Sequence, residues 1–307
     1  MLKKKEKKMK KPLVVGIGEL LWDMLPGGKR AGGAPINFVY HASQMGAEGY
    51  AVSAVGKDDN GTEILAELER SRITGVIARN DYPTGTVEVR LQEGIPFYTI
   101  VENTAWDHIP FQAEAQALVQ KADAVCFGTL ALRQEDSRRT VLRLLRESNP
   151  KALKFFDVNL RHDYYSPELI RQMLEIADIF KLNDEELLRL REMFSLQGSD
   201  ETVCREILRV YGLRYLIFTA GEKYSVVYTP ETSSYLETPR VKVVDTVGAG
   251  DAFSGAFVYA LLMGKPLREA HETATKTAAF VCTKAGAWPV YDGWAEVEAY
   301  FSGREKA

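Results

Sequence analysis

The stretch DTVGAGDAF, from Asp245 to Phe253, sets two carboxylates six residues apart around a glycine turn. YLETPRVKVV before it has strand character, and AFSGAFVYALLMG after it predicts a helix that ends at Gly264, with Pro266 beyond it as a stop signal. The glycines are therefore expected at a helix N-terminus, where backbone N–H groups lack intrahelical partners and the helix dipole is positive. Such a turn is a ready anion site.

An acid beside an anion site needs a chemical reason. The turn lacks the Lys-Ser/Thr pair of a P-loop, and the G-x-G-x-x-G spacing fails at Phe253. A carboxylate would repel a bound phosphate unless it accepts the proton of a hydroxyl that attacks that phosphate. Asp251 is thus a candidate base, and the amides of Gly248, Ala249 and Gly250 form a candidate anion hole. The alternative is a tight strand-to-helix turn with Asp251 as its N-cap.

The rest of the chain predicts an α/β fold. Short apolar or β-branched runs such as LVVGIG, ADAVCFG and RYLIFTAG alternate with amphipathic helical stretches, which is typical of a parallel sheet covered by helices. Two segments break this rhythm: LLWDMLPGGKRAGG, interpreted as a strand followed by a flexible glycine segment, and TGTVEVRLQEGIPFYTIV, interpreted as a β-hairpin. We expect residues 21–32 and 84–106 to project from a domain spanning residues 12–307 as a small β lid.

Composition narrows the class of protein and its partners. A chain of 307 residues with 46% hydrophobic residues can bury a large core, and a net charge of −3 argues against nucleic acid as the main partner. The lysine-rich residues 1–11 are expected to form a disordered, solvated basic tail rather than a nucleic-acid or membrane contact, and no apolar window predicts a membrane span. Cys126, Cys204 and Cys282 fit no ligand pattern, so we expect buried thiols in a cytoplasmic protein.

DTVGAGDAFSGAF closely resembles the C-terminal signature of the ribokinase-like carbohydrate kinases, the PfkB family. Further blocks follow the family's order: VVGIGELLWDMLP with AGGAPINFVYHASQMGA, in the form typical of fructokinases, then FDVNLR, KLNDEEL and FTAGEKYS. The resemblance covers the chain from Val14 to Pro289. It implies a three-layer α/β/α fold with a mostly parallel sheet and a small β lid, and an enzyme that uses ATP and Mg²⁺.

The resemblance also assigns residues to the sugar. Asp251 matches the family's catalytic base, and the preceding Gly-Ala-Gly matches its anion hole. The residues that match or suit the substrate side are Asp23, Gly32, Gly33, Asn37, Arg161 and, on the lid, Phe97. An ionised carboxylate can accept two hydroxyl hydrogen bonds, and paired glycines let a ligand approach. The alternatives are solvated or helix-start roles for the polar residues, and lid-on-lid packing for Phe97.

Nucleotide-binding positions are assigned in the same way. The matching residues are Asn183, Glu186, Thr219, Gly221 and Thr275. Asn183 and Glu186 also have the spacing of a capping box, and both roles can hold together. Glu186 is expected to bind Mg²⁺ through water, because Mg²⁺ keeps several waters. Thr275 departs from ribokinases, which often place Asn there.

A monovalent cation, K⁺ in the first place, is implied at Asp245 and the carbonyl of Val247. The alternative is that Asp245 only caps the turn.

The sequence thus predicts an ATP-dependent sugar kinase that converts fructose to fructose 6-phosphate. Ribose, 2-keto-3-deoxygluconate or another small polyol is the alternative substrate, and a sugar-binding regulator without catalysis is the alternative from a different class. A Rossmann-type dinucleotide enzyme is excluded, because GIGELL lacks the third glycine and the acid expected downstream. If the lids pair, the enzyme is a homodimer.

Overall fold

The computed structural model describes residues 10–25, 27–92 and 95–303, and the side chains of residues 89–98 lie outside this description. Of the predicted basic tail, residues 1–11, only the last two residues are described. Among the described residues, no helix has both the length and the apolar character needed to cross a membrane. Cys126 and Cys204 are buried as expected, whereas Cys282 is only partly buried.

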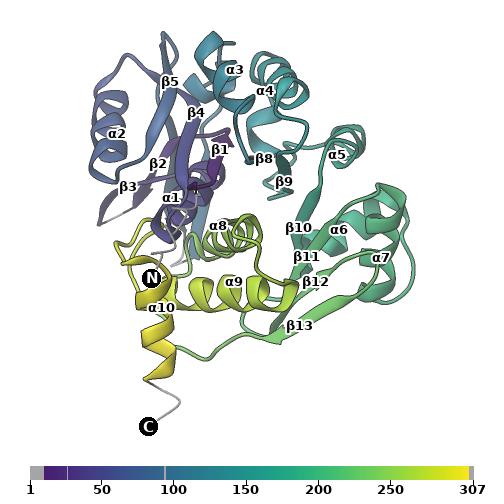
Figure 1. The fold of residues 1–307 in the computed structure, drawn as a ribbon. Helices are drawn as coiled ribbons and strands as arrows, with labels where there is room; N and C mark the ends of the chain where they lie inside the picture. The colour runs from purple at the N-terminus through teal and green to yellow at the C-terminus, as the bar shows by residue number, and fades with distance from the viewer. Residues whose placement is uncertain (1–9, 26, 93–94, 304–307) are drawn as a thin grey trace, which may run out of the picture.

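In the described part of the chain, a nine-stranded sheet has the strand order β13-β12-β11-β10-β9-β8-β1-β4-β5 (Figure 1). Its strands are β1 (Leu13–Ile17), β4 (Glu48–Gly56), β5 (Thr74–Asn80), β8 (Ala124–Gly128), β9 (Leu153–Asp157), β10 (Ile179–Asn183), β11 (Tyr215–Thr219), β12 (Tyr224–Tyr228) and β13 (Ser233–Glu237). Neighbours from β5 to β11 run parallel, and β12 and β13 add antiparallel strands at one edge. The mostly parallel α/β sheet is confirmed.

The strand expected over YLETPRVKVV is shorter than predicted. Only its first three residues belong to β13, which ends at Glu237. Pro239 has no N–H to donate to a ladder, so the strand cannot continue through it unchanged. The chain therefore reaches the glycine turn as an irregular segment.

Helices cover both faces of the sheet (Figure 1). One face carries α1 (Ala34–Met45), α2 (Asp59–Arg70), α8 (Ala249–Leu262) and α9 (Leu267–Val281), with α10 (Gly293–Ser302) against α9, and the other carries α3 (Ala113–Val119), α4 (Glu135–Glu147), α5 (Pro167–Leu174), α6 (Asp184–Phe194) and α7 (Asp200–Val210). The side chains of consecutive residues in β9 point to opposite faces of the sheet and pack on each of them. Phe155 packs against Phe38 of α1 with ring centroids 5.6 Å apart, and Phe156 stacks on Phe127 of β8 at 5.3 Å. The three-layer α/β/α arrangement is confirmed.

A second sheet in the described residues has the order β3-β2-β6-β7. Its strands are β2 (Leu21–Leu25), β3 (Gly28–Gly32), β6 (Gly85–Gln92) and β7 (Ile95–Ile100). β2–β3 and β6–β7 are antiparallel pairs, and a parallel β2–β6 pair joins them. The predicted second hairpin is confirmed, but the first segment is also a hairpin, because the residues expected to be flexible pair with β2 as strand β3.

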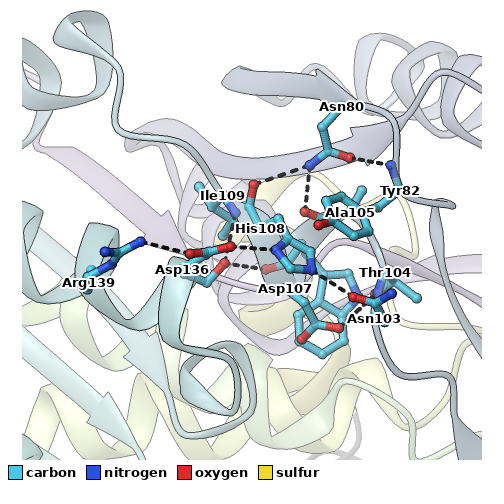
Figure 2. Close-up of polar contacts among 12 residues, drawn as sticks. Asn80, Tyr82, Asn103, Thr104, Ala105, Asp107, His108, Ile109, Asp136 and Arg139 are labelled. Carbon is cyan, nitrogen blue, oxygen red and sulfur yellow. Dashed lines mark hydrogen bonds and ion pairs between the residues drawn. The ribbon is translucent and has the colours of Figure 1, made fainter.

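The chain returns from the second sheet through the 3-10 helix η1 (Ala105–His108), before a further turn η2 (Leu130–Leu132). Figure 2 shows the polar contacts that hold η1. Asn80 Nδ2 donates to the carbonyl oxygens of Ala105 at 3.0 Å and His108 at 3.2 Å. His108 lies between Asp136 Oδ2, 2.8 Å from Nδ1, and Asn103 Oδ1, 2.9 Å from Nε2. These contacts join the base of the second sheet to β5 and α4.

A buried ion pair completes this attachment. Arg133 Nε and Nη2 donate to the two carboxylate oxygens of Asp107 at 2.7 and 2.8 Å, and the side chains are 3% and 0% exposed. Arg133 Nη2 also donates to the carbonyl of Val101 at 2.7 Å. The arginine therefore satisfies a carboxylate that water cannot reach.

We expect Arg133→Met to lower the free energy of unfolding by about 3–5 kcal/mol, because it leaves the Asp107 carboxylate buried and unpaired. Urea denaturation followed by circular dichroism measures the change. Arg139→Met is the matched control, since it removes an exposed pair with Asp136 and should cost less than about 1 kcal/mol. Equal losses in the two variants would contradict this account.

Candidate active site

The predicted base and the predicted sugar-binding Asn lie on two helices in direct backbone contact. A Cβ added to Gly255 of α8 would lie 2.6 Å from the carbonyl oxygen of Phe38 and 2.9 Å from the amide nitrogen of Ala42, both in α1. The absence of a side chain at Gly255 therefore permits this close approach. As a result Asn37 of α1 lies beside Asp251 of α8, and Asn37 Nδ2 donates to Asp251 Oδ2 at 2.7 Å.

A tryptophan fixes the orientation of the Asn37 amide. Trp288 Nε1 donates to Asn37 Oδ1 at 2.7 Å, and because an indole N–H can only donate, Nδ2 must face Asp251. Burial, together with the negative charge of Asp157, raises the pKa of Asp251 to about 7, although the bond from Asn37 and the charge of Lys181 act in the opposite direction. Such a carboxylate can take up a proton near neutral pH.

The glycine turn forms the N-terminus of α8, as predicted. Gly248 is the N-cap with φ 77°, a conformation that favours glycine, and a Cβ there would make a tight contact of 3.0 Å with Ala287. The amide of Ala249 already donates to the carbonyl of Thr246 at 3.2 Å. Among the described residues, the amides of Gly248 and Gly250 have no acceptor. These two N–H groups are the donors that the turn offers to an anion.

Asp245 caps this turn and also contacts the second sheet. Its Oδ1 accepts from the amide of Val247 at 3.1 Å, and its Oδ2 accepts from the amide of Gly286 at 2.9 Å and from Arg30 Nη1 of β3 at 2.7 Å. Burial alone would raise the pKa of Asp245, but these two amides and the guanidinium hold it below its usual value. The carboxylate of Asp245 is therefore ionised and already paired with the guanidinium group of Arg30.

On the sugar side, Asp23 of β2 is a carboxylate without a hydrogen-bond donor among the described residues. Burial raises its pKa to about 6, against the charges of Arg161 and Arg30. Gly32 lies against it, since a Cβ there would be 3.1 Å from Asp23 Oδ2. Arg161 is exposed, donates to the carbonyl of Leu160 at 3.0 Å, and its charge also acts on Asp251. The charge of Arg161 thus acts on both Asp23 and Asp251, and a shared sugar site stays a prediction. The side chain of Phe97 lies outside the described residues.

Glu19 is a buried acid of this site that the sequence reasoning missed. It is 2% exposed; its Oε1 accepts from the amide of Ala34 at 3.0 Å, and its Oε2 has no partner among the described residues. Burial and then the charge of Asp251 raise the pKa of Glu19 to about 7, although backbone hydrogen bonds lower it. Gly33 packs against the backbone of Glu19: its φ is 122°, and a Cβ there would lie only 2.0 Å from the Glu19 carbonyl oxygen. Glu19 therefore fixes the start of α1, which carries Asn37.

On the nucleotide side, the predicted capping box is confirmed. Asn183 Oδ1 accepts from the amide of Glu186 at 2.8 Å, and Glu186 Oε2 accepts from the amide of Asn183 at 2.8 Å. Glu186 Oε1 accepts from the amide of Leu160 at 3.1 Å, so both carboxylate oxygens hold backbone donors. In the described residues, no cluster of three or more His, Cys, Asp or Glu side chains could hold a metal. Contact of Glu186 with Mg²⁺ through water stays a prediction.

The other residues predicted to bind the nucleotide lie where β11 ends and β12 begins, but they differ in solvent exposure. Thr219 ends β11, and Gly221 follows in an open turn with φ 54° and no atom within 4 Å of its Cβ position. Thr275 of α9 is 5% exposed, and its hydroxyl donates to the carbonyl of His271 at 2.9 Å. Its contact with a nucleotide stays a prediction.

Two further buried charges were missed although they lie within the quoted blocks FDVNLR and KLNDEEL. Lys181 of β10 and Asp157 of β9 are partners in the parallel ladder, and Lys181 Nζ donates to Asp157 Oδ2 at 2.7 Å. Their side chains are 8% and 9% exposed. A lysine two residues before a helix cap gives no signal of this pairing in a sequence, because the strand order decides it.

Comparison with known proteins identifies the family. Residues 26–291 match the model of the pfkB family carbohydrate kinases. The chain belongs to this family. An uncharacterized sugar kinase of Pyrococcus horikoshii is 28% identical over 297 residues, which cover 90% of this chain and 92% of that protein. Fructokinase-2 of Zea mays is 28% identical over 308 residues, 90% of each chain.

Solved structures of PfkB-type kinases share the fold. The structure of a fructokinase from Xylella fastidiosa with bound ATP aligns with a TM-score of 0.84 at 21% identity, over 96% of this chain and 100% of that one. The structure of the Pyrococcus horikoshii sugar kinase aligns with a TM-score of 0.78. The ribokinase-like fold is therefore confirmed, and the second sheet is consistent with the small β lid that was predicted.

Glu19→Gln should make the stability of the protein less dependent on pH. The carboxyl ionises near pH 4.5 when unfolded and near 7 when folded, so its contribution to stability is intact below pH 4.5 and is lost as the pH rises to 7. Relative to the wild type, the variant should gain about 2 kcal/mol between pH 5 and pH 8. Urea denaturation at both pH values measures this. Glu206→Gln, on the exposed face of α7, is the control, and a gain of the same size there would refute the assignment to Glu19.

Proposed function

We propose that this PfkB carbohydrate kinase transfers the γ-phosphoryl group of ATP to a hydroxyl of fructose and produces fructose 6-phosphate. The observation that carries the proposal is the position of Asp251 at the start of α8, where Asn37 Nδ2 holds it at 2.7 Å. It lies beside two amides that have no acceptor among the described residues. An acid and a set of N–H donors at one helix start suit an attacking hydroxyl and the phosphoryl group that it attacks.

The transfer itself needs one proton acceptor. Asp251 Oδ1 has no hydrogen-bond donor among the described residues, so it is available to the sugar hydroxyl. The O–H bond breaks as the new O–P bond forms, the proton moves to Asp251, and the bond between the γ-phosphorus and the bridging oxygen breaks to release ADP. The amides of Gly248 and Gly250 would hold the charge on the transferred group, with Ala249 completing the turn.

The sugar would be held by Asp23, Asn37 and Arg161. Asp23 has no donor among the described residues, which suits two hydroxyls of a sugar. Similarity to a maize fructokinase supports fructose. The second candidate is an acidic sugar such as 2-keto-3-deoxygluconate, which the charges of Arg161 and Arg30 around Asp23 would favour; ribose is a further alternative. The geometry around Asp251 favours an enzyme over a regulator without catalysis.

Metal ions and assembly complete the proposal. Mg²⁺ would arrive with ATP and contact Glu186 through water, with Asn183, Thr219 and Gly221 on the nucleotide side. K⁺ would bind near Asp245 and the carbonyl of Val247, although Arg30 already offsets part of the charge of Asp245. We further propose a cytoplasmic homodimer that pairs through the small sheet, which would close over the sugar and exclude water.

Asp251→Asn should lower kcat by about 100-fold or more, because the amide cannot accept the proton. Isothermal titration should show nearly unchanged binding of MgATP and sugar. In the wild type, kcat/KM should rise with pH up to about 7 and then level off, since Asp251 must be ionised to act. Unchanged turnover in the variant would exclude Asp251 as the base.

A screen of ADP release across sugars tests the substrate. We expect fructose to give the highest kcat/KM among fructose, ribose, 2-keto-3-deoxygluconate, adenosine and fructose 1-phosphate. A coupled assay for ADP measures all five under the same conditions. If another sugar ranks well above fructose, the specificity is wrong although the family assignment stands.

A further inference from the structure

Lys181 brings a buried positive charge to the glycine turn. It is the middle residue of β10 and pairs with Asp157, which ends β9 at the edge of the α/β sheet where ligands bind. A Cβ added to Gly250 would lie 3.4 Å from Lys181 Nζ, which is ordinary van der Waals contact. The ammonium group therefore lies against the last glycine of the turn, whose amide has no acceptor among the described residues.

The hydrogen bonding of this ammonium is incomplete. An ammonium group has three N–H donors, and in the described part of the chain only Asp157 Oδ2, at 2.7 Å, accepts from Lys181. The residue is 7% exposed, so bulk water does not take up the remaining donors freely. Buried polar groups are normally satisfied, which indicates that a ligand completes this set.

The surrounding charges explain why an ammonium is needed here. Burial alone would lower the pKa of Lys181, but the carboxylates of Asp157, Glu186 and Asp251 raise it and favour the charged form. A phosphoryl group that entered between Asp157 and Asp251 would be repelled by both. The buried ammonium of Lys181 contacts both Asp157 and the glycine turn, so it can offset that repulsion where the anion would lie.

We propose that Lys181 is a further catalytic residue, whose ammonium group binds an oxygen of the transferred phosphoryl group together with the amide of Gly250. This inference rests on the proposed phosphoryl transfer and extends it. Lys181 forms no covalent bond and moves no proton. It stabilises the charge on the phosphoryl oxygens, while Asp157 fixes the position of the ammonium group.

The rival explanation is a structural ion pair in which Lys181 only neutralises Asp157. Two variants separate these roles: Lys181→Met, and the double variant Lys181→Met with Asp157→Asn, which removes both partners of the ion pair. If Lys181→Met fails to fold, as shown by its urea denaturation curve, the double variant still carries the test. Lys154→Met, on the same strand as Asp157 but at its other end, is the matched control.

Binding and turnover are measured for each variant. We expect both Lys181 variants to bind ADP within about twofold of the wild type, and to bind the non-hydrolysable analogue AMP-PNP about 10-fold or more weakly, because they lose a charged hydrogen bond to the γ-phosphoryl group. Single-turnover rates with saturating sugar should fall by about 100-fold or more in both variants. Lys154→Met should match the wild type in all three measurements.

Two results would overturn the inference: a double variant that turns over within about threefold of the wild type, or a ratio of AMP-PNP to ADP affinity that does not change. Either result would leave the proposed function intact. Failure of the proposed function gives a different pattern, since the wild type itself would then bind no nucleotide or phosphorylate none of the sugars.

Discussion

The backbone contact between α1 and α8 is the constraint on which the site depends. Gly255 lies one turn after Asp251, and its missing side chain lets the two helices touch. The contact sets the distance between Asn37 and Asp251. Trp288 and Glu19 hold α1 in place through hydrogen bonds with the Asn37 side chain and the Ala34 amide. A single close approach of two helices thereby converts residues more than two hundred positions apart into one hydrogen-bonded unit.

The electrostatic character of the site follows from burial around this unit. Asp251, Glu19 and Asp23 all have raised pKa values because the fold removes them from water, and Asp157 adds negative charge. An isolated set of buried acids would be unstable. Lys181 and Arg161 offset part of that cost. Burying these acids lowers the stability of the protein, but it gives the site groups that change protonation near neutral pH. Such groups are a common feature of active sites.

Much of the fold could be predicted from the sequence, because strands and amphipathic helices each have a characteristic spacing of apolar residues. The glycine turn at Asp251 could also be predicted, since its residues are contiguous in the sequence. The pair of Lys181 and Asp157 was not, because it arises from β9 and β10 lying side by side, which no local pattern encodes. Strand β3 was missed for a related reason: GKRAG has weak strand propensity and is a strand only because β2 pairs with it.

The parallel pairing of β2 with β6 has a consequence for how the protein folds. Residues 26–84 lie between these strands in the chain and contain β3, α1, β4, α2 and β5. The two hairpins can therefore join into one sheet only after a long loop has closed, and the entropy of that closure is lost before the β2–β6 pairing contributes any stability. We expect the small sheet to assemble late, on a main sheet that already exists.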